Sequence, residues 1–289
     1  MKEGYSYRGS VKSSVSDELI NTYVMRPLAG VLVRVLYRTP VTPNQVTVAA
    51  AVSGFAAAAL YASGDPMQTV AAGVFISIKD LLDSADGQLA RAKGLFSRAG
   101  RFLDSIGDIA VNFSVCAANA AAALNGGAGA WTLLAWGGAF LGITLRVSYH
   151  VFYQTSFLHL RDTYAGNRTS EELRPEDLAG DRQALALQRI FLILYGWQDR
   201  MMAALDRWCR RGLPAEADSR WYGDAAAVRL SGFLGIGTEL FLLMLCSVAG
   251  ATGAYLLLNL GGMNLFWGVC VWYRRRVVRA RIARTGVRG

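Results

Sequence analysis

The feature that most constrains this chain is a group of carboxylates in a segment flanked by long apolar runs. Asp83, Asp86, Asp104 and Asp108 follow one another within a short stretch of the sequence. A charged side chain at the centre of a membrane-spanning helix costs roughly 2.5–3.5 kcal/mol on insertion scales, so four of them facing lipid would cost on the order of 10 kcal/mol. We therefore expect these side chains to face water, a cation or one another.

The spacing of the carboxylates predicts two helices that meet. Residues three and four apart share a face of a helix. The pattern therefore predicts one stripe of Asp83, Asp86, Gly87 and Ala90, and a second of Gly100, Asp104 and Asp108. A break at 93–99 would let the two helices run antiparallel with their stripes in contact. The small residues of the first stripe leave room for a ligand between the carboxylates.

Such a cluster offers hard oxygen ligands, which suit Mg²⁺ or Mn²⁺ better than zinc. Mg²⁺ usually binds to a few carboxylates together with the phosphates of a substrate. The residues alone therefore predict a metal-dependent site for a phosphate or pyrophosphate at a membrane surface.

The complete pattern, D-x2-D-G-x2-A-R-x8-G-x3-D-x3-D, resembles the signature of the CDP-alcohol phosphotransferases, also called CDP-alcohol phosphatidyltransferases. All eight fixed positions are present, namely Asp83, Asp86, Gly87, Ala90, Arg91, Gly100, Asp104 and Asp108. The resemblance implies a membrane enzyme in which a CDP-alcohol donates its phosphoryl-alcohol group to an acceptor hydroxyl and CMP leaves. It also implies two bound ions of Mg²⁺ or Mn²⁺ and a homodimer.

The resemblance further implies a role for each position. Asp83, Asp86 and Asp104 would hold the metal ions, and Asp108 would be the general base for the acceptor hydroxyl and could also touch a metal. Gly100 would let its helix start close against the preceding one. The implied nucleotide contacts are Asn44, Thr47, Asp83, Gly87, Ala90, Arg91 and Gly100. For Asn44 and Thr47, helix capping is an equally good explanation.

The substrates are less constrained than the reaction. An acceptor with its own phosphate, such as glycerol 3-phosphate or inositol phosphate, would need cationic partners, and the candidates are Arg98, Arg101, Arg146 and Arg229. Each is also typical of an anchor at the membrane interface. CDP-diacylglycerol is the expected donor, because a site at the membrane surface can hold lipid tails between helices. The alternatives are a soluble CDP-choline or CDP-ethanolamine with a lipid acceptor, and a catalytically silent membrane scaffold. Glu239 could pair with an arginine or contact a substrate.

The composition indicates an integral membrane protein. The 289 residues are 53% hydrophobic, carry a net charge of +9 and include several long apolar runs. A basic excess would also fit a nucleic-acid partner, but the arginines lie beside the apolar runs, where the positive-inside rule expects them. We therefore predict no nucleic-acid binding. The four cysteines form no pair at metal-ligand spacing and read as small buried residues.

We expect an all-α membrane protein with six transmembrane helices. A cytoplasmic N-terminus with an amphipathic surface helix would cover 1–45, although an ordinary docked helix fits the same pattern. The remaining regions would be helices one to four over 46–153, a cytoplasmic helical insertion over 154–227, helices five and six over 228–273, and a basic tail over 274–289. Within the insertion, 183–211 predicts an amphipathic helix that lies on the membrane, on the enzyme or in a dimer contact.

Charge asymmetry predicts the orientation in a cytoplasmic or inner membrane. The expected short turns at 63–66, 125–129 and 250–253 contain no Lys or Arg. The other side carries Lys93, Arg98, Arg101, the insertion and the tail. The positive-inside rule therefore places the carboxylate motif on the cytoplasmic side.

Overall fold

The computed structural model describes residues 6–7, 18, 20–161, 171–178 and 181–286. Secondary structure in these ranges is entirely helical. The predicted all-helical fold is confirmed.

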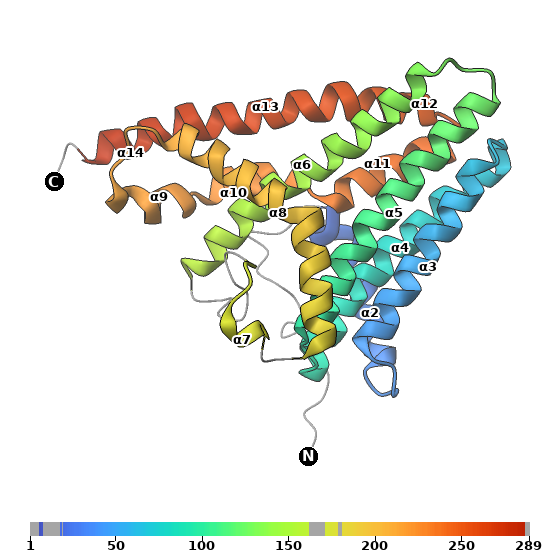
Figure 1. The fold of residues 1–289 in the computed structure, drawn as a ribbon, viewed down its shortest axis with the longest axis horizontal. Helices are drawn as coiled ribbons and strands as arrows, with labels where there is room; N and C mark the ends of the chain where they lie inside the picture. Colours follow the sequence, from blue (N-terminus) through green and yellow to red (C-terminus); the bar gives the residue numbers. More distant parts are fainter. Residues whose placement is uncertain (1–5, 8–17, 19, 162–170, 179–180, 287–289) are drawn as a thin grey trace.

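Three long helices form the part of the bundle that carries the motif. They are α3 (Pro43–Ala62), α4 (Pro66–Lys93) and α5 (Arg98–Asn125), and α3 packs against both of the others. Figure 1 shows the α3–α4 and α5–α6 turns at one end of the bundle, at the upper right, and the α4–α5 turn at the other end.

Local capping signals set the ends of these helices. Thr42 and Gln45 form a reciprocal capping box at the start of α3, and the side chain of Asp65 accepts a hydrogen bond from the Gln68 backbone at the start of α4. Gly94 ends α4 in the left-handed conformation, with φ +67°, which glycine adopts without steric cost. Ser97 then caps α5. The break predicted at 93–99 is therefore observed, and it turns the chain back on itself.

Four further helices pack with these three in the bundle. They are α6 (Trp131–His159), α11 (Ile236–Val248), the short α12 (Thr252–Leu257) and α13 (Asn264–Tyr273). The short α10 (Ala225–Ser231) and a 3₁₀ turn (Gly232–Leu234) lead into α11. Two π-helical stretches, Leu258–Met263 and Arg274–Val278, join α12, α13 and α14 (Arg279–Gly286) into one helical path. The predicted basic tail is therefore helical from 274 to 286.

The core lies between α3, α4, α5, α6, α11 and α12 and relies on small residues for close packing. Buried Ala57, Ile76, Val111 and Trp136 belong to one apolar cluster. A Cβ on Gly54 would lie 2.4 Å from Cγ1 of Val111. The backbones of α3 and α5 can therefore approach each other only with glycine at position 54.

Within the described residues, four helical stretches are long and apolar enough to cross a membrane: Pro43–Ala62, Arg98–Asn125, Ala225–Val248 and Thr252–Arg284. The predicted second and fourth spans, α4 and α6, are not among them, so the count of six is not confirmed. These helices contain Lys79, Asp80 and Arg146, all of which are buried among other helices. These buried charged residues lower the mean hydropathy of α4 and α6 although they do not face lipid.

The N-terminal helix consists of a π-helical turn, Asn21–Met25, followed by α2 (Arg26–Leu36). Ala29 and Val33 pack against Val46 and Leu89. The opposite side is also apolar, since Val31 is exposed together with Leu28 and Val35. The helix is therefore docked on α4 with an apolar outer face, and its position at a membrane surface stays a prediction.

The predicted insertion contains α7 (Pro175–Leu178), α8 (Arg182–Arg210) and α9 (Asp218–Tyr222), and α6 extends into it as far as His159. The predicted helix at 183–211 corresponds to α8. This helix crosses in front of α5 and α6 in Figure 1 and packs against both. The insertion is therefore folded onto the bundle at the level of α5 and α6.

Candidate active site

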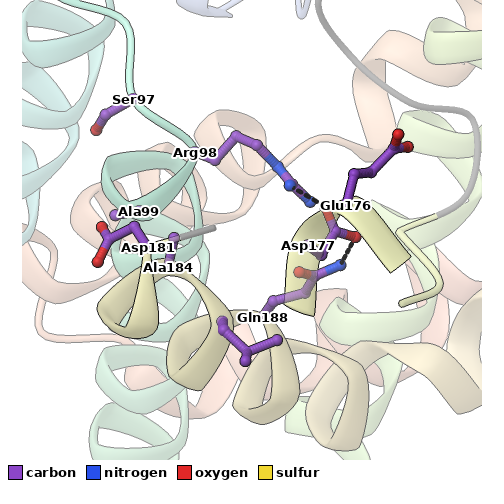
Figure 2. A pocket seen from close by; sticks show the side chains of 9 residues that line it. Ser97, Arg98, Ala99, Glu176, Asp177, Asp181, Ala184 and Gln188 are labelled. Carbon is purple, nitrogen blue, oxygen red and sulfur yellow. Dashed lines mark hydrogen bonds and ion pairs between the residues drawn. The ribbon is translucent and has the colours of Figure 1, made fainter. Parts of the chain in front are cut away.

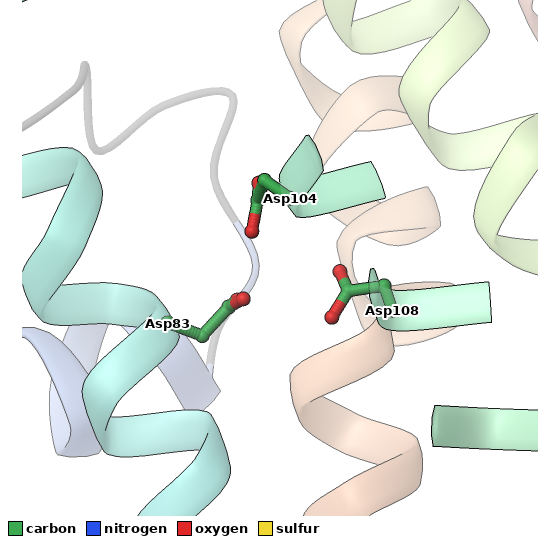
Figure 3. Close-up of side chains that lie close together, drawn as sticks. All are labelled: Asp83, Asp104 and Asp108. Carbon is green, nitrogen blue, oxygen red and sulfur yellow. The ribbon is translucent and has the colours of Figure 1, made fainter. Parts of the chain in front are cut away.

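Helices α4 and α5 bring three of the predicted carboxylates together. One carboxylate oxygen from each of Asp83, Asp104 and Asp108 lies within 4.8 Å of the other two. Figure 3 shows Asp83 extending from α4 toward Asp104 and Asp108, which follow each other by one turn on α5. All three residues are half-buried. We call these three side chains the carboxylate cluster.

Asp86 lies one turn further along α4 and has a different partner. The Thr47 hydroxyl donates to Oδ2 of Asp86 at 2.5 Å, and both residues are buried. This bond joins the start of α3 to α4. Thr47, predicted to contact the nucleotide, is thus hydrogen-bonded to Asp86, predicted to hold metal.

The sequence interpretation overlooked Lys79. Its side chain is 2% exposed, and its Nζ lies 3.4 Å from Oδ1 of Asp83 and forms an ion pair with Asp108. Lys79 precedes Asp83 by four residues, so the two share a face of α4. A lysine at this spacing inside an apolar run was the signal that could have identified it.

The two motif glycines differ in their surroundings. A Cβ on Gly100 would lie 2.6 Å from Oδ1 of Asn44 and 2.7 Å from Oγ of Ser97. The close neighbour of Gly100 is therefore the first long helix, α3, and not the second as expected. A Cβ on Gly87 would meet no described atom closer than Nη1 of Arg91, at 3.5 Å. The chain itself therefore does not require glycine at position 87, whereas a closely bound ligand would.

Two of the predicted acceptor-binding arginines face the insertion. Arg98 forms ion pairs with Asp177 and, at 3.4 Å, with Glu171, and Arg101 pairs with Glu171 at 2.5 Å. Figure 2 shows Arg98 reaching Asp177 from α5 while Gln188 reaches it from α8. A cavity of about 260 Å³ lies between the start of α5, α7 and α8. Both arginines are therefore partnered by acidic residues at the edge of α5.

Arg146 forms a buried ion pair with Glu239. Its guanidinium is fully buried and donates to Oε1 of Glu239 at 2.9 and 2.6 Å. It also donates to the Asn259 carbonyl at 3.2 Å and to Oδ1 of Asn264 at 2.5 Å. The fourth candidate, Arg229, is exposed on α10. The pairing of Glu239 with an arginine is thus observed, and it occupies the Arg146 side chain.

Helix α8 covers α5 beside the cluster, which the sequence did not reveal. The Tyr195 hydroxyl donates to the Ser105 carbonyl at 2.7 Å, and Phe191 packs against Phe102 with ring centroids 5.2 Å apart. Burial, and then the nearby negative charges of Asp108 and Asp104, raise the pKa of the Tyr195 phenol. Tyr195 therefore stays protonated and acts as a hydrogen-bond donor.

A comparison with protein families agrees with this arrangement. Residues 40–167 match the family model described as CDP-alcohol phosphatidyltransferase. These residues are a CDP-alcohol phosphatidyltransferase domain. Members of this family transfer a phosphoalcohol group from a CDP-alcohol to an acceptor, generally with a divalent metal, in membrane phospholipid synthesis. The domain includes α3 to α6 and the whole carboxylate cluster. No curated protein matches the chain.

Proposed function

We propose that this chain transfers the phosphatidyl group of CDP-diacylglycerol to the hydroxyl of a phosphorylated polyol, such as glycerol 3-phosphate or inositol phosphate, and releases CMP. The observation that carries the proposal is the carboxylate cluster inside the transferase domain. We further propose that the site faces the cytoplasm and that the enzyme is a homodimer. Support for the orientation comes from the short turns without Lys or Arg at the opposite end of the bundle.

The residues of the cluster fit a divalent metal. Three carboxylate oxygens from two helices lie within 4.8 Å of one another, and hard oxygen ligands of this kind suit Mg²⁺ or Mn²⁺. In the proposal, Asp83, Asp86, Asp104 and Asp108 hold two ions between them. Bound Mg²⁺ or Mn²⁺ would neutralise charge on the pyrophosphate and on the leaving CMP oxygen.

Asp108 is the proposed general base. It accepts the proton of the acceptor hydroxyl while the hydroxyl oxygen bonds to the phosphatidyl phosphorus and the bond from that phosphorus to CMP breaks. Lys79 orients Asp108, since its ammonium group contacts both Asp108 and Asp83. The lysine is buried and held on α4, so it fixes the carboxylate with little freedom.

The nucleotide is proposed to lie between the starts of α3 and α5 and the last turns of α4. The exposed side chain of Asn44 lies beside Gly100, and a Cβ at position 87 would be in ordinary contact with the Arg91 guanidinium, at 3.5 Å. Asp83, Thr47, Ala90 and Arg91 complete the proposed set.

The acceptor phosphate is proposed to bind Arg98 and Arg101, with Arg229 as a further candidate. Arg98 and Arg101 already pair with Glu171 and Asp177, so a phosphate would have to exchange with these carboxylates. Arg146 is the weakest member of the predicted set, because its guanidinium is buried against Glu239.

CMP release by the purified protein in liposomes tests the reaction. The assay supplies CDP-diacylglycerol, Mg²⁺ or Mn²⁺, and in turn glycerol 3-phosphate, inositol 1-phosphate, inositol and serine. We expect release with one acceptor, loss of release with a chelator, and loss in Asp83→Asn and Asp108→Asn. Asp80→Asn is the matched control: it makes the same substitution three residues before Asp83 on α4, at a buried carboxyl group outside the cluster.

Two other outcomes would replace the proposal. If CMP is released only with CDP-choline or CDP-ethanolamine and diacylglycerol, the donor is the soluble substrate and the acceptor is the lipid. A folded protein that binds CDP-diacylglycerol but releases no CMP with any substrate pair would be a scaffold.

A further inference from the structure

Helix α8 exposes a continuous apolar stripe on the side away from the bundle. Its large members are Ile190, Ile193, Trp197, Met201 and Trp208, and Ile193 is 77% exposed. The intervals of three, four and seven residues between them place these side chains on one face of the helix. Exposed Ala186 and Ala204 continue the same face. The stripe therefore runs along nearly the whole of α8.

A row of arginines follows one edge of this stripe. At 3.6 residues per turn, the positions that line this edge are Arg182, Arg189, Arg200, Arg207 and Arg211. All five are exposed, and within the described part of the chain none of them has an ion-pair partner. The edge is therefore a line of positive charge beside an apolar surface.

The opposite face of α8 is already used. Gln188, Met202, Asp206 and Cys209 are buried there, and the helix packs against α5 and α6. The apolar stripe is thus a second face of α8, which the described chain leaves exposed apart from the contact of Arg275 with Trp208. Contiguous exposed apolar surfaces of this kind mark interaction sites.

We propose that this stripe lies in the interfacial layer of the membrane that holds the bundle, with the arginine row on the phosphates of anionic lipids. An apolar face with Trp and a basic edge is the pattern of helices that lie in the membrane interface. Arginine binds phosphate oxygens in bidentate geometry. The charge of the row is thus complementary to an anionic lipid surface.

The stripe is also continuous with a candidate membrane span. The Arg275 guanidinium lies 3.5 Å from the centroid of the Trp208 ring. Arg275 belongs to the helical stretch Thr252–Arg284, which is long and apolar enough to cross a membrane. The C-terminal end of α8 therefore meets the basic end of this stretch, where an interfacial helix would join the bilayer.

A second copy of the chain would complement the stripe less well. In an antiparallel two-fold pair, the arginine rows would lie side by side and repel each other. In a parallel pair, each row would face the other edge of the stripe, which carries Leu187, Leu194 and Leu205 and no acidic residue. Neither arrangement supplies the negative charge that lipid phosphates supply.

Spin labels in proteoliposomes test the inference without reference to catalysis. In a background whose four cysteines are replaced by alanine, Ile193→Cys is labelled on the stripe. Asp199→Cys is the matched control, because it is exposed on the same helix but lies off the stripe. Accessibility to oxygen, which partitions into lipid, is compared with accessibility to a water-soluble nickel complex. The vesicles contain phosphatidylcholine with or without phosphatidylglycerol.

We expect the label at position 193 to be accessible to oxygen and protected from nickel, and the label at position 199 to show the reverse. Replacement of the five arginines by glutamine should reduce the protection in vesicles with phosphatidylglycerol. Equal nickel accessibility at both positions would overturn the proposal. Spin–spin broadening between protomers at position 193 would also overturn it, because a second copy would then cover the stripe. An unchanged protection in the glutamine variant would overturn the role of anionic phosphate.

Discussion

The buried pair of Arg146 and Glu239 gives the most quantitative prediction. Glu239 accepts three hydrogen bonds within normal distance from charged or amide donors, two from Arg146 at 2.9 and 2.6 Å and one from Asn259 at 2.9 Å. Both side chains are almost completely buried. Removal of one partner from a buried pair costs about 3–5 kcal/mol, since the other charge remains without compensation. We therefore expect Arg146→Met to destabilise the protein by about that amount.

The corresponding change in melting temperature is large enough to measure. A loss of 3–5 kcal/mol lowers Tm by on the order of 10 °C in a protein of this size. The assay is tryptophan fluorescence during heating in detergent, with the single variants Arg146→Met and Glu239→Gln and the double variant. The double variant should recover part of the loss, because the two effects are coupled.

One result would refute this reasoning. If Arg146→Met kept the wild-type Tm but raised the KM for the acceptor and not for the CDP-alcohol, Arg146 would contact the acceptor, as the sequence suggested. A lower Tm in the single variants with additive losses in the double variant would show that the two side chains do not stabilise each other.

Three further predictions concern the site. Lys79→Met should lower CMP release and raise the affinity for Mn²⁺ several-fold, measured by titration calorimetry, because the carboxylate cluster loses its neighbouring cation. An unchanged Mn²⁺ affinity would contradict this prediction. Gly87→Ala should keep the wild-type Tm but abolish binding of the CDP-alcohol. Gly100→Ala should lower Tm, because its Cβ would meet side-chain atoms at 2.6 and 2.7 Å. Equal effects of the two variants on Tm would refute this distinction between the glycines. Glu171→Gln should lower the acceptor KM, because Arg101 loses a competing carboxylate; a KM that stays constant would argue against Arg101 as an acceptor ligand.

Local sequence signals were sufficient for the core of the site. The intervals of three and four residues in the motif predicted that α4 and α5 would each present a carboxylate face, and the glycine at position 94 ends α4 where the break was expected. The contact of Asp83 with Asp104 and Asp108 required only that two adjacent helices turn back on each other. Such short-range information is available in a single sequence.

Long-range pairing was not accessible in the same way. Arg101 pairs with Glu171 and Arg146 with Glu239, across segments with no shared periodicity. Tyr195 reaches Ser105 only because α8 folds back over α5. The identity of a cation's partner depends on the register of helices that are distant in sequence, so the arginines could be named as candidates but not assigned.

The balance of charge inside the bundle distinguishes a structural ion pair from a site that binds a ligand. Arg146 and Glu239 balance each other, one cation with one anion, and their remaining polar atoms contact asparagines. In the part of the chain that the structure describes, the carboxylate cluster brings three carboxylates together, and Lys79 forms ion pairs with two of them, Asp83 and Asp108. An excess of negative charge at half-buried positions is costly unless a cation compensates it. A fold that needed these residues only for stability would be expected to balance them, as it does at Arg146. The imbalance at the cluster fits the proposed site for divalent cations.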